Sequence, residues 1–517
     1  MLKFTALLLT VLASFAGVMR SSVRVEQGLL SGTPGTDPAV TVYRGVAFAA
    51  PPVGDLRWRA PRPPASWQGV RKANQFSANC MQEMRESLGP WTTEYQPQGA
   101  ISEDCLYLNV WTAAKSLKEK RPVLVYFPGG AFTGGSGNVP VYNGEGLAKK
   151  GLVVVTVNYR VGVLGFLAHP DLTKESGQRS SGNYGLLDQV AALEWIKKNI
   201  AAFGGDPTRV TIMGQSAGAA SVHYLMASPL AKGLFIRAIP QSGTNFRQGP
   251  GETLAVAEQT GVRFAEVKGA TTLAALRAMS AAEVIAPSNV NVNGEFRFYP
   301  IVDGWFLPKS VDDTFAAGEQ NDVPTLTGWV ADEGSYNADY GKASPEEFRK
   351  QIRQRTGTLA NEILKLYPAT TEAEAVDSQK AFARDRAVVS MYLWAEQRAK
   401  TSKTKVFTYL FTHAQPGPTH DLYMAFHSSE LPYVFDNLNQ SNRPWIAEDR
   451  AIAEMMSGYW VNFISTGDPN GKGLPAWRAF NEANALTMEL GDRMRQRPVA
   501  SKEKFDLLKK LITAPAH

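Results

Sequence analysis

Short, mainly apolar runs recur along the middle of the chain, and several are bounded by glycine or proline. Their length and their lack of polar alternation predict strands that are buried on both faces. Strands of this kind form the interior of parallel sheets. The runs are Leu106–Trp111, Val123–Phe127, Leu152–Val157, Arg209–Met213, Phe235–Ile239, Val323–Trp329 and Val406–Phe411.

Longer segments with a helical pattern lie between these runs. Apolar residues recur at helical spacing from Leu187 to Trp195, and residues 252–399 are mainly helical apart from one strand. A further helix is predicted over Ala447–Ile464, where Gly467 and Pro469 mark its end. Strands that alternate with helices predict an α/β fold, in which helices cover both faces of a mostly parallel central sheet.

The start of the chain has a different pattern. Residues Val23–Leu30 and Val40–Val46 alternate between apolar and polar positions, and Gly32–Gly35 reads as the turn between them. This pattern predicts an N-terminal antiparallel β-meander. The following segment, from Ala50 to Pro64, contains too many prolines for regular structure.

The first sixteen residues resemble a secretory signal peptide. Lys3 precedes the apolar stretch Phe4–Phe15, and Ser14-Phe15-Ala16 offers a small-x-small cleavage site after Ala16. The alternative is a buried N-terminal helix. We therefore predict a signal peptide over residues 1–16, a secreted or periplasmic protein, and no stable membrane insertion, since the segment is too short to span a bilayer.

The composition fits one globular enzyme. The 517 residues are 44% hydrophobic and 20% charged, and no linker or repeat divides them, so residues 17–517 are predicted to form one domain. The net charge of +6 comes from dispersed Lys and Arg with acidic neighbours, which does not predict nucleic-acid binding. Two cysteines in an exported chain, Cys80 and Cys105, suggest one disulfide and cannot form a structural zinc site.

One stretch carries the strongest chemical signal. The predicted strand Arg209–Met213 leads directly into Gly214-Gln215-Ser216-Ala217-Gly218, a G-x-S-x-G motif, and small helix-forming residues follow. A sharp turn between strand and helix lifts a serine oxygen toward a base, and glycines on either side let strand and helix pass closely. Ligands of such sheets bind beyond the carboxyl ends of the strands, which is where Ser216 falls.

A glycine-rich loop follows another predicted strand. It runs from Phe127 through Gly129 and Gly130 to Gly135. No Gly-Lys-Ser/Thr follows, so a phosphate-binding role is disfavoured. Consecutive backbone N–H groups in such a loop are better suited to binding an oxyanion.

The base and the acid remain open from spacing alone. The expected chain order is nucleophile, acid, histidine, which leaves His413, His420 and His427 as possible bases. The acid is expected just after the strand Val323–Trp329, where Asp332 and Glu333 are neighbours, and only one of them can orient an imidazole.

Many ordered motifs resemble the type-B carboxylesterase family, which includes relatives of the cholinesterases and of bacterial p-nitrobenzyl esterases. The likeness covers nearly the whole chain after the signal segment. It rests on Tyr43-Arg44-Gly45 with Pro51-Pro52, the run from Glu103 to Val110, Asn158-Tyr159-Arg160, Gly182 to Gln189, Phe203 to Pro207, Asp332-Glu333-Gly334, His427 to Leu431 and Gly467 to Asn470.

The resemblance implies an α/β-hydrolase fold and a set of site residues. Ser216 would be the nucleophile, His427 the base and Glu333 the acid, with no metal or cofactor. The oxyanion donors would be the N–H groups of Gly130, Ala131 and Ala217. Cys80–Cys105 would be a disulfide, and Arg44–Glu103 and Arg160–Asp188 would be structural ion pairs.

Two departures from the family pattern affect the predicted specificity. Pro128 replaces the usual His or Tyr, and neutral Gln215 stands where the family often has Glu. Trp91 does not align well with the cation-binding Trp of some relatives. We therefore predict a serine esterase that acts on neutral, small-molecule carboxylic esters. The alternatives are hydrolysis of amides, lactones or carbamates by the same triad, or a non-catalytic binding protein. The sequence does not predict an oligomeric state.

Overall fold

The computed structural model describes residues 22–243, 251–286, 296–483 and 485–514. The predicted signal segment lies outside these residues, and the division of the chain into that segment and one domain stays a prediction.

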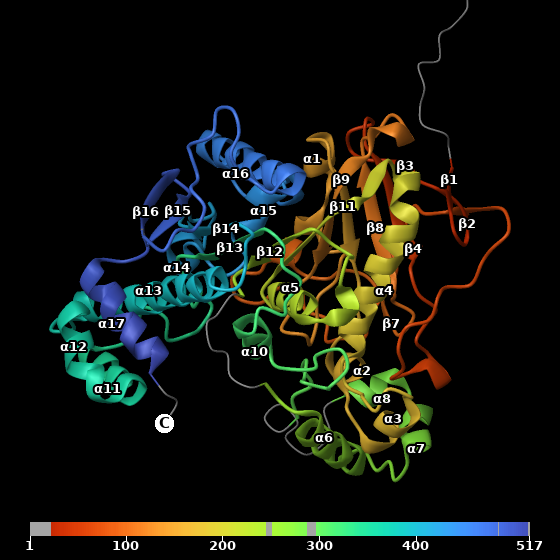
Figure 1. Cartoon of the computed structure of the whole chain (residues 1–517), viewed down its shortest axis with the longest axis horizontal. Coiled ribbons are helices and arrows are strands. Elements are labelled where there is room, and N and C mark those ends of the chain that lie inside the picture. The colour runs from red at the N-terminus through yellow and green to blue at the C-terminus, as the bar shows by residue number, and fades with distance from the viewer. Residues whose placement is uncertain (1–21, 244–250, 287–295, 484, 515–517) are drawn as a thin grey trace, which may run out of the picture.

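An eleven-stranded sheet forms the centre of the molecule (Figure 1). The strands lie in the order β16-β15-β14-β13-β12-β11-β9-β10-β8-β4-β3. Neighbours from β10 through β15 run parallel, whereas the strands at the two edges pair antiparallel. The strands are β3 Thr33–Pro34, β4 Thr41–Ala47, β8 Tyr107–Thr112, β9 Arg121–Phe127, β10 Val153–Val157, β11 Gly205–Gln215, β12 Arg237–Gln241, β13 Thr325–Val330, β14 Val406–Phe411, β15 Leu486–Leu490 and β16 Arg495–Pro498. The prediction of a mostly parallel sheet is thus confirmed.

The inner strands are buried on both faces because successive side chains enter two different cores. In β9, Val123 and Val125 pack into one core, and Leu124 and Tyr126 pack into the other. Helices α4 (Tyr184–Asn199) and α5 (Ala217–Ala227) complete the first core. Helices α1 (Glu145–Lys149) and α16 (Ala447–Thr466) complete the second.

Two further groups of helices extend beyond the sheet (Figure 1). One group contains α2 Gly162–Phe166, α3 Pro170–Glu175, α6 Leu254–Val267, α7 Leu273–Ala278 and α8 Ala281–Ile285. The other contains α11 Pro345–Thr356, α12 Ala360–Leu366, α13 Glu372–Ala399 and α17 Lys502–Thr513. The remaining short helices are α10 Val311–Ala316, α14 His420–Tyr423 and α15 Leu431–Val434. None of the described helices is both long and apolar enough to cross a membrane.

The N-terminal strands are antiparallel, as predicted, but their boundaries differ. Residues 23–31 form a hairpin of β1 (Val23–Val25) and β2 (Gly28–Ser31), with Val23 opposite Leu30. Together with β5 (Val70–Lys72) they form a separate small sheet. The predicted turn at Gly32–Gly35 contains β3, which pairs with β4 in the main sheet.

One of the two expected ion pairs is wrong. Glu103 binds Arg57 through both carboxylate oxygens, each at 2.6 Å from a guanidinium nitrogen. Arg44 instead donates to Thr33 Oγ1 and lies over the ring of Phe76. Arg57 comes from the proline-rich segment, which turns back beside Glu103 and also donates to the carbonyl oxygens of residues 277 and 279.

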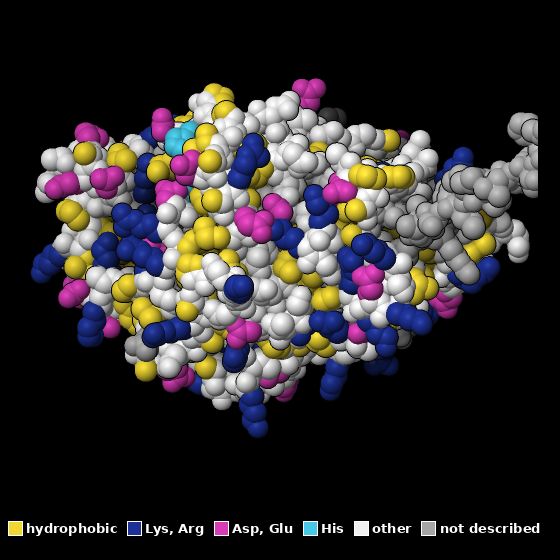
Figure 2. Space-filling model, turned by 90° about the horizontal axis from the view of Figure 1, so that it is seen from above, with side chains coloured by type: hydrophobic (Ala, Val, Ile, Leu, Met, Phe, Trp, Pro, Cys, Tyr) yellow, Lys and Arg dark blue, Asp and Glu magenta, His cyan; other side chains and the backbone are white. Residues whose placement is uncertain are grey.

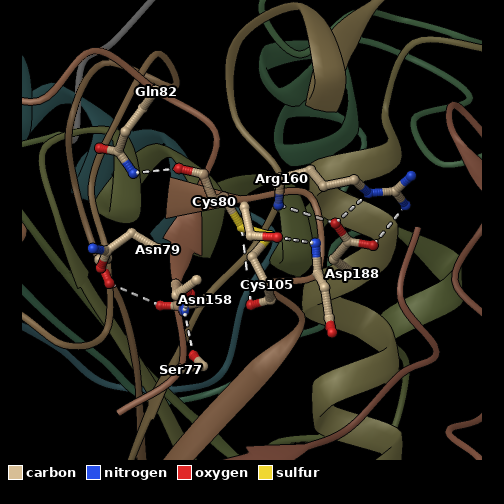
Figure 3. Close-up of a disulfide and its surroundings, with 12 residues drawn as sticks. Ser77, Asn79, Cys80, Gln82, Cys105, Asn158, Arg160 and Asp188 are labelled. Carbon is tan, nitrogen blue, oxygen red and sulfur yellow. Dashed lines mark hydrogen bonds and ion pairs between the residues drawn. A yellow bond between two sulfur atoms is a disulfide. The ribbon is translucent and has the colours of Figure 1, made fainter. Parts of the chain in front are cut away.

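The second expected ion pair and the disulfide lie close together (Figure 3). The guanidinium of Arg160 binds both oxygens of Asp188 at 2.7 and 2.8 Å, and both side chains are buried. Cys80 and Cys105 form a disulfide. It joins β6 (Asn79–Cys80), which pairs with β7 (Ile101–Ser102), to the residues just before β8.

Charged side chains of both signs share the surface. On the face seen in Figure 2, Lys and Arg are spread among Asp and Glu. This arrangement agrees with the dispersed positive charge of the sequence.

Candidate active site

Ser216 lies on a sharp turn between strand and helix. β11 ends at Gln215 and α5 begins at Ala217, so Ser216 alone joins them. Its φ of 59° and ψ of −124° are strained for a non-glycine residue. The turn requires a close approach, because a Cβ at Gly218 would lie 2.0 Å from the carbonyl oxygen of Phe127. These features are those of a nucleophile elbow.

The glycine-rich loop after β9 lies directly beside this turn. A Cβ at Gly129 would come within 3.1 Å of the Cβ of Ser216. Ala131 and Phe132 both have positive φ angles, and the carbonyl oxygen of Gly130 accepts hydrogen bonds from the N–H groups of residues 133 and 134 at 3.0 Å. Within the described part of the chain, the N–H groups of Gly130, Ala131 and Ala217 have no acceptor. Three free donors near one serine suit an oxyanion.

Of the two candidate acids, Glu333 is the one beside a histidine. Its Oε2 accepts a hydrogen bond from His427 Nδ1, and its Oε1 accepts one from the N–H of Val330 at 2.9 Å. Asp332 points elsewhere, because its oxygens accept from the hydroxyl of Tyr340 and the N–H of Ala425.

Backbone pairing explains why Glu333 and His427 meet. Asp332 and Phe426 form a parallel bridge between the loop after β13 and the loop before α15. The N–H of Asp332 donates to the carbonyl oxygen of Ala425 at 3.0 Å. Glu333 follows Asp332 and His427 follows Phe426, so each catalytic candidate is next to this bridge. Two loops from distant parts of the sequence are thereby held in one register.

The remaining histidines lie in other environments. His413 bonds Asp449 and Asp492 at 2.9 and 2.5 Å, and His420 is half-exposed and contacts the carbonyl oxygen of Gln415. His169 accepts from the first turn of α3, and burial lowers the pKa of His223 to about 3. The structure therefore distinguishes His427 from the other candidates, which the spacing could not do.

A pocket of about 540 Å³ brings the predicted residues together. Ser216, His427, Gly130 and Ala131 all line it. Ser216 and His427 form no hydrogen bond with each other in the described structure. Contacts of this kind often tighten only when substrate binds.

Aromatic side chains form one wall of this pocket. The indole Nε1 of Trp91 donates to the carbonyl oxygen of His427 at 2.9 Å, and Tyr336 lies 5.1 Å from the Trp91 ring. Trp91 belongs to the loop closed by the disulfide, so that loop contributes to the site. Sequence reasoning did not find Tyr336, and no local pattern marks it.

Two carboxyl groups influence the basicity of His427. Burial lowers the pKa of His427, but the charge of Glu333, its hydrogen bond and the charge of Glu430 together raise it above the usual value. Glu430 is fully buried, and its Oε1 accepts from Gln241 Nε2 at 3.0 Å. Burial and the nearby charge of Glu333 raise the pKa of Glu430 to about 7. The Glu in the His427–Leu431 motif was visible in the sequence, but nothing there indicated this role.

Comparison with known proteins agrees with this geometry. A model of the carboxylesterase family matches residues 19–507. The chain belongs to the carboxylesterase family. This carboxylesterase is similar to a solved structure of a PNB esterase, with a TM-score of 0.78, 31% identity, and coverage of 95% of this chain and 99% of that one. The α/β-hydrolase fold implied by the sequence motifs is thus confirmed.

Esterases are also its relatives in sequence. The fumonisin B1 esterase of Sphingopyxis macrogoltabida is 38% identical over 477 residues, which cover 89% of this chain and 85% of that one. The para-nitrobenzyl esterase of Bacillus subtilis (strain 168) is 33% identical, with coverage of 90% and 94%. The human cocaine esterase is 34% identical, with coverage of 88% and 84%. The carboxylesterase is therefore a carboxylic ester hydrolase.

Replacing Glu430 by Gln should change the pH dependence of activity. The negative charge of Glu430 helps to retain a proton on His427. Without that charge, the base becomes neutral at lower pH, so the acidic limb of kcat/KM should move to lower pH. The measurement is kcat/KM for p-nitrophenyl acetate across the pH range from 5 to 9.

Stability provides a second measurement on the same variant. In the folded chain the pKa of Glu430 is about 7, above the ordinary glutamate value of 4.5, so the unfolded chain loses this proton at lower pH. Stability is therefore lost as pH rises from 4.5 to 7, by on the order of 3 kcal/mol. Glu430→Gln should not show this loss. Its free energy of unfolding, relative to that of wild type, should therefore be higher at pH 8 than at pH 4.5. Parallel pH curves for the two proteins would contradict the expectation.

Proposed function

We propose that this carboxylesterase hydrolyses neutral carboxylic esters in two steps, through an acyl-enzyme on Ser216. The observation that supports this proposal most directly is the set of residues that line one pocket. Ser216 on its strained turn, His427 and the glycine-rich loop all line this pocket, and Glu333 accepts a hydrogen bond from His427.

The proposed chemistry uses side chains and backbone alone. Ser216 Oγ attacks the ester carbonyl carbon while its proton passes to His427, and Glu333 stabilises the imidazolium. The N–H groups of Gly130, Ala131 and Ala217 bind the oxyanion. The alcohol leaves with the proton from His427. Water then attacks the acyl group, gives its proton to His427, and the carboxylic acid leaves as Ser216 recovers a proton.

The charges around the pocket support a preference for neutral esters. Glu83 and Arg85 are the acidic and basic side chains among its described lining residues, and they bind each other at 2.9 Å. Gln215, next to the nucleophile, is uncharged and buried. The described residues that line the pocket therefore carry no net negative charge that would attract a cationic substrate.

Rapid mixing with p-nitrophenyl acetate and p-nitrophenyl butyrate tests the reaction. We expect a burst of p-nitrophenol equal to the enzyme concentration, and an acyl adduct on the Ser216 peptide by mass spectrometry. The absence of turnover for both esters would overturn the proposal. For specificity, acetylcholine is compared with the uncharged ester 3,3-dimethylbutyl acetate. A strong preference for acetylcholine would contradict the proposed neutral substrate class.

We also propose that the enzyme is exported. The pattern of residues 1–16 and the Cys80–Cys105 disulfide both suit an oxidising compartment. The test is the N-terminal sequence of the protein recovered from the periplasm or medium of producing cells. An intact Met1 on cytoplasmic protein would contradict export.

A further inference from the structure

The side chain of Gln215 lies against the imidazole of His427. Gln215 is only 2% exposed, and its Nε2 is 3.1 Å from His427 Nε2 and 3.4 Å from His427 Nδ1. A nitrogen almost equally far from both ring nitrogens cannot lie in the ring plane, because it would collide with ring carbon atoms. The amide nitrogen therefore lies over the face of the ring.

Neighbouring hydrogen bonds fix which end of the Gln215 amide faces the ring. The indole N–H of Trp91 can only donate, and it lies 3.3 Å from Ser428 Oγ. Ser428 Oγ in turn donates to Gln215 Oε1 at 3.0 Å. If the amide were turned round, the buried Ser428 hydroxyl would lose its acceptor within the described structure. The NH₂ group of Gln215 is thus the end that faces His427.

An N–H group over an aromatic face favours the neutral ring. The ring face carries negative charge density and accepts a weak hydrogen bond, whereas an imidazolium repels the positive end of the N–H dipole. We propose that Gln215 is a positioning residue that disfavours protonation of His427, through an amide oriented by Ser428 and Trp91. This inference rests on the proposed role of His427 as the base.

The other charged groups near His427 act in the opposite direction. Glu333 and Glu430 both favour the imidazolium. Asp332, beside Glu333, is turned toward Tyr340 and Ala425. The Glu83–Arg85 pair lines the same pocket and is internally neutralised. Gln215 therefore offsets the two carboxylates and keeps more of the base neutral near the working pH.

Two substitutions separate the N–H group from a simple packing role. Gln215→Met keeps the approximate volume and removes the N–H dipole. Gln215→Glu places a negative charge beside the ring. We expect the acidic limb of kcat/KM for p-nitrophenyl acetate to rise by several tenths of a pH unit in Gln215→Met, and by about one unit or more in Gln215→Glu. At a pH below the acidic limbs of both wild type and variant, a shift of the limb by one pH unit lowers kcat/KM about tenfold.

An NMR titration of His427 in histidine-labelled protein gives a readout that needs no turnover. Its midpoint should rise in the same order, from wild type to Gln215→Met to Gln215→Glu. Gln96→Met is the matched control, since Gln96 lines the same pocket and contacts the Trp91 carbonyl oxygen; its midpoint should equal that of wild type.

The titration also separates this inference from the proposed function. A wild-type protein that does not hydrolyse esters but shows the expected midpoints would reject only the function. A midpoint in Gln215→Met at or below the wild-type value would overturn the inference. A rise in Gln215→Glu alone would do the same, because the added negative charge would then account for the whole shift.

Discussion

Replacing Ser216 by Ala is expected to lower kcat for p-nitrophenyl butyrate by at least about 10⁴-fold. The change removes the nucleophilic oxygen but leaves the oxyanion donors and the pocket. A residual rate above that in water is therefore expected, from binding and oxyanion stabilisation alone. Steady-state hydrolysis at saturating ester, with the variant purified apart from any wild-type enzyme, measures the effect.

Ser221→Ala is a matched control in the same helix. Ser221 is fully buried and does not line the pocket, and its hydroxyl accepts a hydrogen bond from Gln189 in the core. This variant should retain most of the wild-type activity even if its thermal stability falls. A Ser216→Ala protein that stays within tenfold of wild type, with an unchanged melting temperature, would reject Ser216 as the nucleophile.

The core of the fold could be predicted because the sequence repeats one physical pattern. β14 occupies Val406–Phe411, as predicted, since a fully buried strand needs an uninterrupted apolar run. Helix α16 ends at Thr466, and Gly467 adopts a left-handed conformation with φ of 85°. A glycine after an apolar helix is a signal that depends on local structure alone.

The N-terminal hairpin could not be predicted in detail. Alternation continues from Val23 to Leu30, although the chain reverses at Glu26 and Gln27. Neither residue is a typical turn former, so the local sequence carries no signal for the reversal. The Arg44–Glu103 pairing failed for a related reason, because the path of the proline-rich segment that carries Arg57 depends on tertiary packing.

The candidate site divides in the same way. The turn around Ser216 and the donor loop after β9 were visible as motifs, since each needs particular glycines close to the reacting atoms. The choice of His427 and Glu333 came only from resemblance, and the geometry that favours them is the bridge between Asp332 and Phe426. The contacts of Gln215 and Glu430 with this pair depend on long-range packing, which no local pattern reveals.

The distinction between the two neighbouring acids leads to a second large expected effect. Glu333→Gln should lower kcat by about 10⁴-fold, by analogy with loss of the acid in serine proteases. An amide at this position can donate to His427 Nδ1, which then gives up its own proton. The ring would carry its proton on Nε2 and could not accept one from Ser216. The kcat of Asp332→Asn should stay within about tenfold of the wild-type value. Asp332 accepts hydrogen bonds from the Tyr340 hydroxyl and the N–H of Ala425, and not from His427.

The two variants form a matched pair, since each exchanges one carboxylate for an amide of the same size at adjacent positions. Burst amplitudes with p-nitrophenyl acetate report the active fraction, so a folding defect in either variant can be separated from a slower chemical step. A slow Glu333→Gln enzyme whose rate is restored at high pH would still place the defect on the imidazole. Loss of activity in Asp332→Asn with retention in Glu333→Gln would reverse the assignment. The loop after β13 would then have to present a different side chain to His427 during catalysis from the one it presents in this structure.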